Sequence, residues 1–260
     1  MIPMQRRQFM TQSLAASALA LTTSAAIATP TPKRPYFELR RYALTSGGPA
    51  GKLADAYFAD ALIPAINRLG IPAVGAFKLD IGPDTPTVYI LIPSTALETL
   101  ANLDTLLAKD AVYLKAAEPF LSAPADHPAF HRLDSTLLSA FDDFAIPATG
   151  KRIFQLRIYE SPTQQAHENK VAMFANAEIG IFRSVGMTPV FFAKALIGPS
   201  LPNLTYMLVF NDQDDLQAKW SAFSAAPAWK KLVAMPGNGD DSLIRQITNL
   251  YLSPKPYSQI

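Results

Sequence analysis

The residues best suited to chemistry lie on two short stretches that repeat one another. One stretch is Tyr36–Tyr42 (YFELRRY), and the other is Ile153–Tyr159 (IFQLRIY), which begins 117 positions later. Each stretch reads as a β-strand and holds an arginine two positions before a tyrosine. Because side chains alternate across a strand, the polar members of each stretch share one face. These candidate ligand-binding residues are Glu38, Arg40, Tyr42, Gln155, Arg157 and Tyr159.

The opposite face of both strands is apolar, with Leu39 and Leu156 among its members. We expect that apolar face to pack on helices, which would turn the polar face toward a central cleft. An arginine in a partly dry cleft requires a partner. Arg40 and Arg157 therefore either bind an anionic or carbonyl group of a ligand, or pair internally with groups such as Glu38 and fix the register of the two halves.

Other residue types that support catalysis or metal binding occur without a matching pattern. His127 and His131 lie four positions apart, but Pro124 and Pro128 predict a loop instead of the helix that such a metal site needs. Haem bound by a loop histidine is kept as a minor alternative, and otherwise no cofactor and no metal site are predicted. His167 is expected on the solvated start of a helix. The chain has no cysteine, which excludes disulfides, thiolate metal sites and a cysteine nucleophile.

Much of the remaining chain is repeated as well, so the two stretches belong to a duplicated folding unit. Some matches lie 116 positions apart and others 117. The one-residue differences fall in predicted loops, where insertions are tolerated. The pairs at 116 are Gly70/Gly186, Gly82/Gly198, Pro83/Pro199 and Pro86/Pro202, and the pairs at 117 include Tyr89/Tyr206 and Leu91/Leu208.

Periodicity and turn residues predict the same order of elements in each copy: strand, helix, two strands, helix, strand. A short extra helix precedes each last strand. This βαββαβ order is typical of a ferredoxin-like unit, whose helices lie on one face of an antiparallel sheet. The predicted ranges are 36–44, 51–69, 73–79, 87–92, 95–108, 110–120 and 132–141 in the first copy, and 153–160, 164–185, 190–197, 204–210, 213–225, 227–235 and 243–252 in the second.

A ferredoxin-like sheet leaves one face bare, and a bare apolar face is unstable in water. We therefore predict an α+β fold in which two tandem ferredoxin-like units pack sheet to sheet as an intramolecular dimeric α+β barrel. The first unit covers 36–141, the linker 142–152 and the second unit 153–260. The ligand site is expected in the cleft between the sheets. Further homo-oligomerisation is compatible with this arrangement.

Residues 1–28 are typical of an export signal peptide. Arg6 and Arg7 precede a weakly apolar run without acidic residues, and Ala26–Ala28 fits a signal-peptidase site. The Arg-Arg-x-Phe pattern resembles a twin-arginine (Tat) signal. We therefore expect the mature protein to be periplasmic or secreted.

The expected mature chain carries a balanced charge. Loss of residues 1–28 removes two of the 23 basic residues and none of the 21 acidic ones, so the basic isoelectric point comes from the signal. Binding to nucleic acid by counterion release needs a surplus of lysine and arginine, so nucleic acid is not a predicted partner. No segment after residue 28 is long and apolar enough to span a membrane, so no membrane span is predicted in the mature protein.

The chain resembles the NIPSNAP family, within the dimeric α+β barrel superfamily. The resemblance rests on Tyr36–Tyr42, Leu69–Gly75 (LGIPAVG), Leu156–Tyr159 (LRIY) and Ala226–Leu232 (APAWKKL), the last of which resembles the family's tryptophan-bearing short helix. Tyr113 lies near the corresponding place in the first copy. The resemblance implies a sheet-lined cavity. The superfamily includes cofactor-free oxygenases, haem-degrading enzymes and isomerases, so the resemblance supplies no catalytic residue.

Three functions are expected, in descending order. The first is an exported protein that binds a small, largely apolar or amphipathic molecule between its sheets, with the arginine and tyrosine of each repeat orienting the polar end. The second is a cofactor-free or haem-linked oxygenase or isomerase, for which Glu38 and His127 are the candidate bases. The third is a scaffold whose exposed helices bind a protein partner.

Overall fold

The computed structural model describes residues 34–145, 150 and 152–260. Residues 34–260 form one compact unit, and the following description concerns this unit alone. The predicted signal peptide, residues 1–28, lies outside the described residues. Among the helices that are described, none has the length and apolar character needed to cross a membrane.

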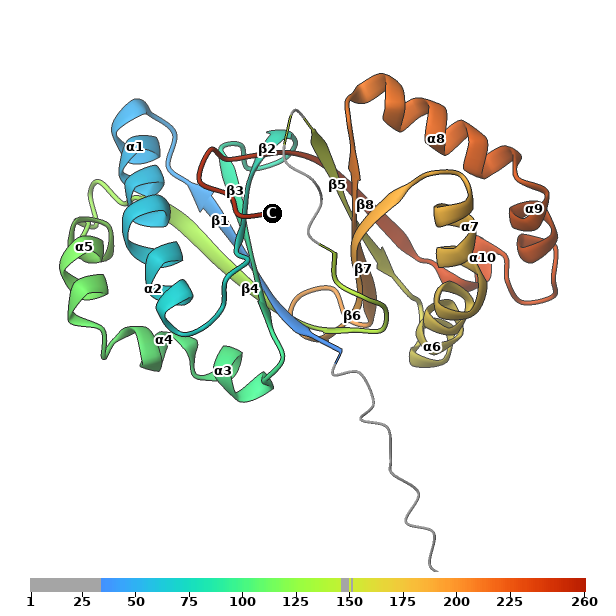
Figure 1. Ribbon diagram of the computed structural model, residues 1–260, viewed down its shortest axis with the longest axis horizontal. Coiled ribbons are helices and arrows are strands. Elements are labelled where there is room, and N and C mark those ends of the chain that lie inside the picture. The colour runs from blue at the N-terminus through green and yellow to red at the C-terminus, as the bar shows by residue number, and fades with distance from the viewer. Residues whose placement is uncertain (1–33, 146–149, 151) are drawn as a thin grey trace, which may run out of the picture. The chain divides into compact units, whose positions relative to one another are not determined.

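The first repeat has the predicted order of elements, with its helices broken into shorter pieces (Figure 1). Strands and helices follow as β1 (Tyr36–Leu44), α1 (Gly48–Ala56), a π-helical segment (Tyr57–Leu62), α2 (Ile63–Arg68), β2 (Gly75–Ile81), β3 (Thr87–Ser94), α3 (Leu97–Ala101), α4 (Leu103–Leu107), α5 (Ala111–Leu121) and β4 (Phe130–Ala140). The predicted helix over 95–108 is thus two short helices that meet at Asn102.

The second repeat follows the same order. Its elements are β5 (Ile153–Glu160), α6 (Gln164–Met173), a π-helical segment (Phe174–Glu178), α7 (Ile179–Ser184), β6 (Thr188–Ile197), β7 (Asn203–Phe210), α8 (Gln213–Ala225), α9 (Pro227–Val233), α10 (Asp240–Leu243) and β8 (Gln246–Pro254). In both repeats the first helix ends before a glycine in the left-handed region, Gly70 (φ 85°) and Gly186 (φ 76°), as their positions predict.

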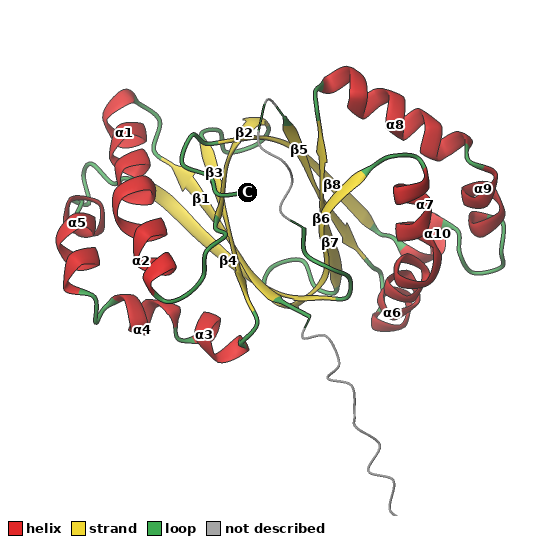
Figure 2. Ribbon diagram, in the orientation of Figure 1, coloured by secondary structure: helices red, strands yellow, loops and turns green. Residues whose placement is uncertain are grey.

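The eight strands close into one barrel in the order β1-β3-β2-β8-β5-β7-β6-β4. Each repeat contributes a four-stranded antiparallel sheet, and the two sheets join at their edges where β2 pairs with β8 and β4 with β6. Figure 2 shows the strands at the centre, with α1–α5 outside the first sheet and α6–α10 outside the second. The predicted α+β barrel is therefore confirmed, and edge pairing makes it continuous.

The interior of the barrel is filled by apolar side chains from both repeats. Phe37 packs on Phe191 with ring centroids 4.9 Å apart, and Phe77 packs on Phe154 at 4.7 Å. The C-terminal residue, Ile260, is fully buried in the same cluster. The apolar faces of β1 and β5 meet in this interior, where closure of the barrel removes their side chains from water.

The predicted direction of the strand faces is therefore wrong. Leu39 and Leu156 lie inside the barrel, whereas Tyr42 and Tyr159 lie on the outer faces, in the clusters that include the helices. The prediction assumed that helices would cover the most apolar face. In the closed barrel the outer faces meet helices that carry polar and aromatic side chains, and these faces tolerate the arginines and tyrosines.

The repeat has a different register in its third strand from the one predicted. Arg40 pairs with Ile90 across β1 and β3, and Arg157 pairs with Tyr206 across β5 and β7. Ile90 and Tyr206 are therefore equivalent, at an offset of 116, and Tyr89 instead faces the barrel interior. Tyr89 and Tyr206 are identical residues at non-equivalent positions. A shift of one residue along a strand turns a side chain to the other face of the sheet, so the two tyrosines face different layers.

Candidate functional site

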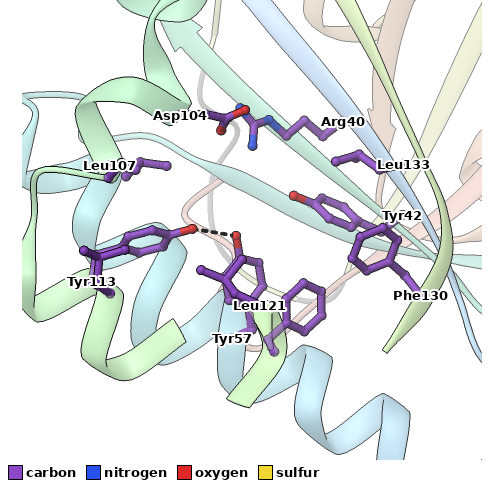
Figure 3. Close-up of a pocket in the computed structure, with 12 residues that line it drawn as sticks. Arg40, Tyr42, Tyr57, Asp104, Leu107, Tyr113, Leu121, Phe130 and Leu133 are labelled. Atoms are coloured by element: carbon purple, nitrogen blue, oxygen red, sulfur yellow. Dashed lines mark hydrogen bonds and ion pairs between the residues drawn. The ribbon is translucent and has the colours of Figure 1, made fainter. Parts of the chain in front are cut away.

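A pocket of about 280 Å³ lies between the outer face of the first sheet and the helices that cover it (Figure 3). Strands β1 and β4 supply one wall, and helices α4 and α5 with the π-helical segment supply the other. Its position means that the polar face of β1 lines a cleft, as expected, but the cleft lies outside the barrel. The lining residues are Arg40, Tyr42, Tyr57, Asp104, Leu107, Ala108, Tyr113, Leu114, Phe120, Leu121, Phe130 and Leu133.

Arg40 is the charged group at the inner end of this pocket, and it is only 5% exposed. Its Nε donates to Oε1 of Glu38 at 2.7 Å, and its Nη2 donates to Oε2 of Glu38 at 3.1 Å and to Oδ1 of Asp104 at 2.9 Å. Ser135 on β4 donates to the same Glu38 carboxylate at 2.8 Å. Both interpretations of Arg40 thus receive support, because it is paired internally and also lines a pocket.

Three tyrosine hydroxyl groups converge beside Arg40. Figure 3 shows the hydroxyls of Tyr42, Tyr57 and Tyr113 turned toward one another across the pocket, with Tyr57 and Tyr113 in hydrogen-bond contact at 3.0 Å. Burial raises the pKa of all three phenols, so they stay neutral and can donate hydrogen bonds at physiological pH. The inner end of the pocket therefore presents several hydrogen-bond donors.

Apart from Asp104, whose side chain is 81% exposed, the walls and the rim of the pocket are apolar. Phe120 and Phe130 stack with centroids 5.5 Å apart, and Phe120 also stacks on Tyr57 at 4.0 Å. At the rim, Leu121 and Leu133 remain 52% and 41% exposed, which is high for leucine. Such a gradient from a polar inner end to an apolar mouth suits an amphipathic molecule that enters with its polar end first.

The corresponding space in the second repeat is closed by tryptophan. The ring of Trp220 on α8 lies over the guanidinium of Arg157 at 4.6 Å, and its Nε1 donates to Oε1 of Gln155 at 2.7 Å. Arg157 also donates to the hydroxyl of Tyr159 at 3.1 Å, and that hydroxyl bonds to Tyr206 at 2.8 Å. The polar face of β5 is therefore satisfied within the protein.

Two substitutions between the repeats account for the different covering of the two arginines. At the offset of 116, Trp220 corresponds to Asp104 and Trp229 to Tyr113. The two tryptophans pack near Phe223, with Trp229 4.6 Å and Trp220 5.6 Å from its ring. Replacing an indole by the short side chain of Asp104 leaves room above the strand, and that room is part of the first pocket.

A buried ion pair lies beneath the helices of the second repeat. Nζ of Lys170 on α6 lies 3.3 Å from Oε2 of Glu178 in the π-helical segment and 3.5 Å from Oδ1 of Asp240. Lys170 also lies over the ring of Phe174 at 5.2 Å. Burial raises the pKa of Glu178 to about 7, although Lys170 acts in the opposite direction. π-Helical turns often occur at functional sites. Here Glu178 in the π-helical segment is instead paired with Lys170 inside the protein.

The structure separates the predicted site residues into two groups. Arg40 and Tyr42 line the pocket, and Glu38 holds Arg40 from behind. Their counterparts in the second repeat, Gln155, Arg157 and Tyr159, are packed under Trp220 or bonded to one another. The expectation that both repeats contribute to one central site is therefore wrong, because each polar face is covered by the helices of its own repeat.

Asp104, Tyr57 and Tyr113 are pocket residues that sequence reasoning missed. An isolated aspartate on a short helix carries no motif, and Tyr57 lies in a helix whose π-helical turn has no simple sequence signature. Tyr113 was noted near the place of the family tryptophan, and the offset of 116 gives the signal that was available. The same offset would have aligned Asp104 with Trp220 in the second repeat.

The histidines differ from their predicted roles. His167 is buried, not solvated, and its Nδ1 has no hydrogen-bond partner among the described residues. His127 is on an exposed loop beside Asp126 and does not line the pocket. The His127 side chain is 82% exposed, so among the described residues nothing encloses its imidazole as a haem pocket would. In the described part of the chain, no three His, Cys, Asp or Glu side chains are placed to hold a metal ion.

Comparison with known proteins gives a family match to the sequence of the second repeat and structural matches to the whole barrel. The NIPSNAP family model matches residues 154–259. No curated protein matches the chain. The match covers the second repeat, and the resemblance of the first repeat to the same family remains a prediction from its sequence.

Solved structures of low sequence identity share the fold over both repeats. A protein of Fusobacterium nucleatum, described provisionally as a monooxygenase, is 10% identical with a TM-score of 0.56, covering 86% of this chain and 94% of its own. A similarly described protein of Lactobacillus acidophilus is 8% identical (TM-score 0.53; 85% and 94%), and an anthrone oxidase-like protein is 12% identical (TM-score 0.50; 85% and 92%). At these identities the likeness shows the fold alone.

Proposed function

We propose that this is an exported protein that binds a small, largely apolar molecule in the pocket of the first repeat. The observation that carries the proposal is the convergence of Arg40 and three neutral phenols at the inner end of a pocket with an apolar, exposed mouth. The polar end of the ligand accepts hydrogen bonds there, and its apolar body lies against Phe130 and the leucines of the rim. This site replaces the inter-sheet cleft expected from the sequence.

The export part of the proposal rests on the signal-like residues 1–28, and the mass of the mature protein tests it. Protein recovered from outside the cytoplasm of an exporting host should have lost residues 1–28. Recovery of the intact chain in the cytoplasm would contradict export.

An oxygenase or isomerase is the alternative function, and the described geometry gives it less support. The neighbours with oxygenase-like descriptions share only the fold. Of the two candidate bases, Glu38 is bonded to Arg40 and Ser135, and His127 lies on an exposed loop away from the pocket. Neither side chain is presented to a molecule in the pocket as a free base.

Blocking the mouth of the pocket should weaken binding. Leu133 lies on β4 at the rim, opposite Tyr42 across the strand pair, so Leu133→Trp would place an indole over the opening at a surface position. The duplication supplies a matched control, because Ile247 lies opposite Tyr159 in the same way and is similarly exposed. Ile247→Trp should leave binding unchanged.

The measurement is fluorescence titration with Nile red, a neutral apolar probe. We expect Leu133→Trp to weaken binding at least about tenfold, which corresponds to about 1.4 kcal/mol. Thermal unfolding of both variants controls for stability. Equal affinity in the wild type and Leu133→Trp, or equal losses in both variants, would show that the probe binds elsewhere and would contradict the assignment of the site.

A further inference from the structure

The two acidic partners of Arg40 differ in how firmly they are held, and this difference indicates which chemical group of the ligand meets Arg40. Glu38 is held by two bonds from Arg40 and one from Ser135, and its side chain is 10% exposed. Asp104 makes one bond to Arg40 while its side chain is 81% exposed. An ion pair with so exposed a partner contributes little to stability, so the Asp104 carboxylate can leave at small cost.

Arg40 and Glu38 by themselves form a neutral pair, and Asp104 adds one negative charge to it. Asp104 can therefore pair with Nη2 of Arg40, but Glu38 already balances the charge of Arg40 without it. The second repeat supports this interpretation, since Trp220 occupies the place of Asp104 and covers Arg157 with no carboxylate hydrogen-bonded to that guanidinium among the described residues. The fold thus tolerates an arginine on this strand without an acid at position 104.

The side chains beside Asp104 favour a ligand whose polar end accepts hydrogen bonds. Tyr57 and Tyr113 share one hydrogen bond between two hydroxyls, so one of their hydrogens remains for another acceptor. Tyr42 points toward the same space (Figure 3). A carboxylate has two oxygens that accept from a guanidinium and from phenols together, in the way Asp104 already accepts from Nη2 of Arg40. An ammonium has no acceptor to offer Arg40 or the phenols, so it would use none of these donors.

We infer that the ligand of this pocket is a carboxylic acid with an apolar body, and that its carboxylate displaces Asp104 from Arg40. Asp104 thus acts as an internal occupant that keeps the guanidinium paired while the pocket is empty. The exchange replaces one carboxylate by another, so the charge around Arg40 is conserved, and the apolar body fills the space lined by Leu107, Phe120 and Phe130. This inference rests on the proposed binding function of the same pocket.

The exchange predicts that removing Asp104 strengthens the binding of acids. Without its competitor and its negative charge, Asp104→Asn should bind decanoate about three to ten times more tightly than the wild type, as measured by isothermal titration calorimetry at pH 8. Binding of 1-decanol, which has no charge, should change less than twofold. Asp214→Asn removes the same charge from an exposed position on α8, in the second repeat, and should change neither affinity.

The outcomes separate this inference from the binding function itself. Weaker or equal binding of decanoate by Asp104→Asn, or decanoate binding no better than 1-decanol in the wild type, overturns the displacement by a carboxylate. If Nile red and 1-decanol still bind and Leu133→Trp still blocks them, the proposed pocket survives that result. Failure of every probe to respond to Leu133→Trp overturns both.

Discussion

Replacing Arg40 by methionine should destabilise the protein by about 3–5 kcal/mol, because it leaves Glu38 as a buried carboxylate with Ser135 as its remaining side-chain donor. Methionine fills much of the space of the arginine stem, so the loss comes mainly from the uncompensated charge. Equilibrium unfolding in urea at pH 7 measures the effect. The variant should also lose ligand binding, even where it remains folded.

A double variant and a matched position distinguish this explanation from a simple packing defect. Glu38→Gln together with Arg40→Met removes both charges and should recover more than half of the lost stability. Arg157→Met, at the equivalent position of the second repeat, breaks one bond to Tyr159 and the contact with Trp220 but leaves no hydrogen-bonded carboxylate behind. It should cost about 1–2 kcal/mol. A double variant as unstable as Arg40→Met would contradict the role of the buried charge.

The buried pair of Lys170 and Glu178 should make stability depend on pH in an unusual direction. Most paired carboxylates have lowered pKa values and destabilise the protein when acid is added. Burial instead raises the pKa of Glu178 to about 7 from its ordinary value of 4.5. Between these two values the folded state binds more protons than the unfolded state, so the contribution of Glu178 is full below about pH 4.5 and is lost as pH rises through about 7.

The variant Glu178→Gln isolates this effect, since glutamine has nearly the same shape and does not titrate. The stability of the wild type relative to this variant should fall by an amount on the order of 3 kcal/mol between pH 4.5 and pH 8.5. Groups shared by both proteins cancel in the comparison, including His167, whose pKa burial lowers and whose contribution has the opposite slope. A difference that is constant with pH, or that rises with pH, would contradict the raised pKa.

The strands could be predicted closely from the sequence because their signals are local. The repeated stretches at Tyr36 and Ile153 and the glycines at Gly70 and Gly186 give the ends of elements without knowledge of the fold. The helices were less accurate. A single helix over 95–108 fits the periodicity, yet it is broken at Asn102, where packing against the sheet decides the path of the chain.

The direction of each strand face could not be predicted from the strand alone. Leu39 and Leu156 are the apolar members in any arrangement, but whether they face the barrel interior or the helix layer depends on how the two sheets join at their edges. The same limit applies to the third strand. Tyr89 and Tyr206 match by identity at 117, and only the pairing of Arg157 with Tyr206 shows that the true offset is 116.

The candidate site was partly predictable for a related reason. Arg40 and Tyr42 were identified because their strand repeats, and they line the pocket. Asp104 and Tyr113 were not assigned to the site because their importance lies in a difference between the repeats, opposite Trp220 and Trp229. Divergence within a duplication opens one copy and closes the other, and alignment at the structural offset is needed to see it.

A crystal structure of the protein grown with decanoate tests the central claim most directly, because it shows where a ligand lies. The account predicts the acid in the first repeat, with its carboxylate on Arg40, Asp104 turned away into solvent, and its apolar chain between Phe130 and Leu121. Ligand inside the barrel among Phe37, Phe154 and Phe191, or beside Trp220 in the second repeat, would contradict it.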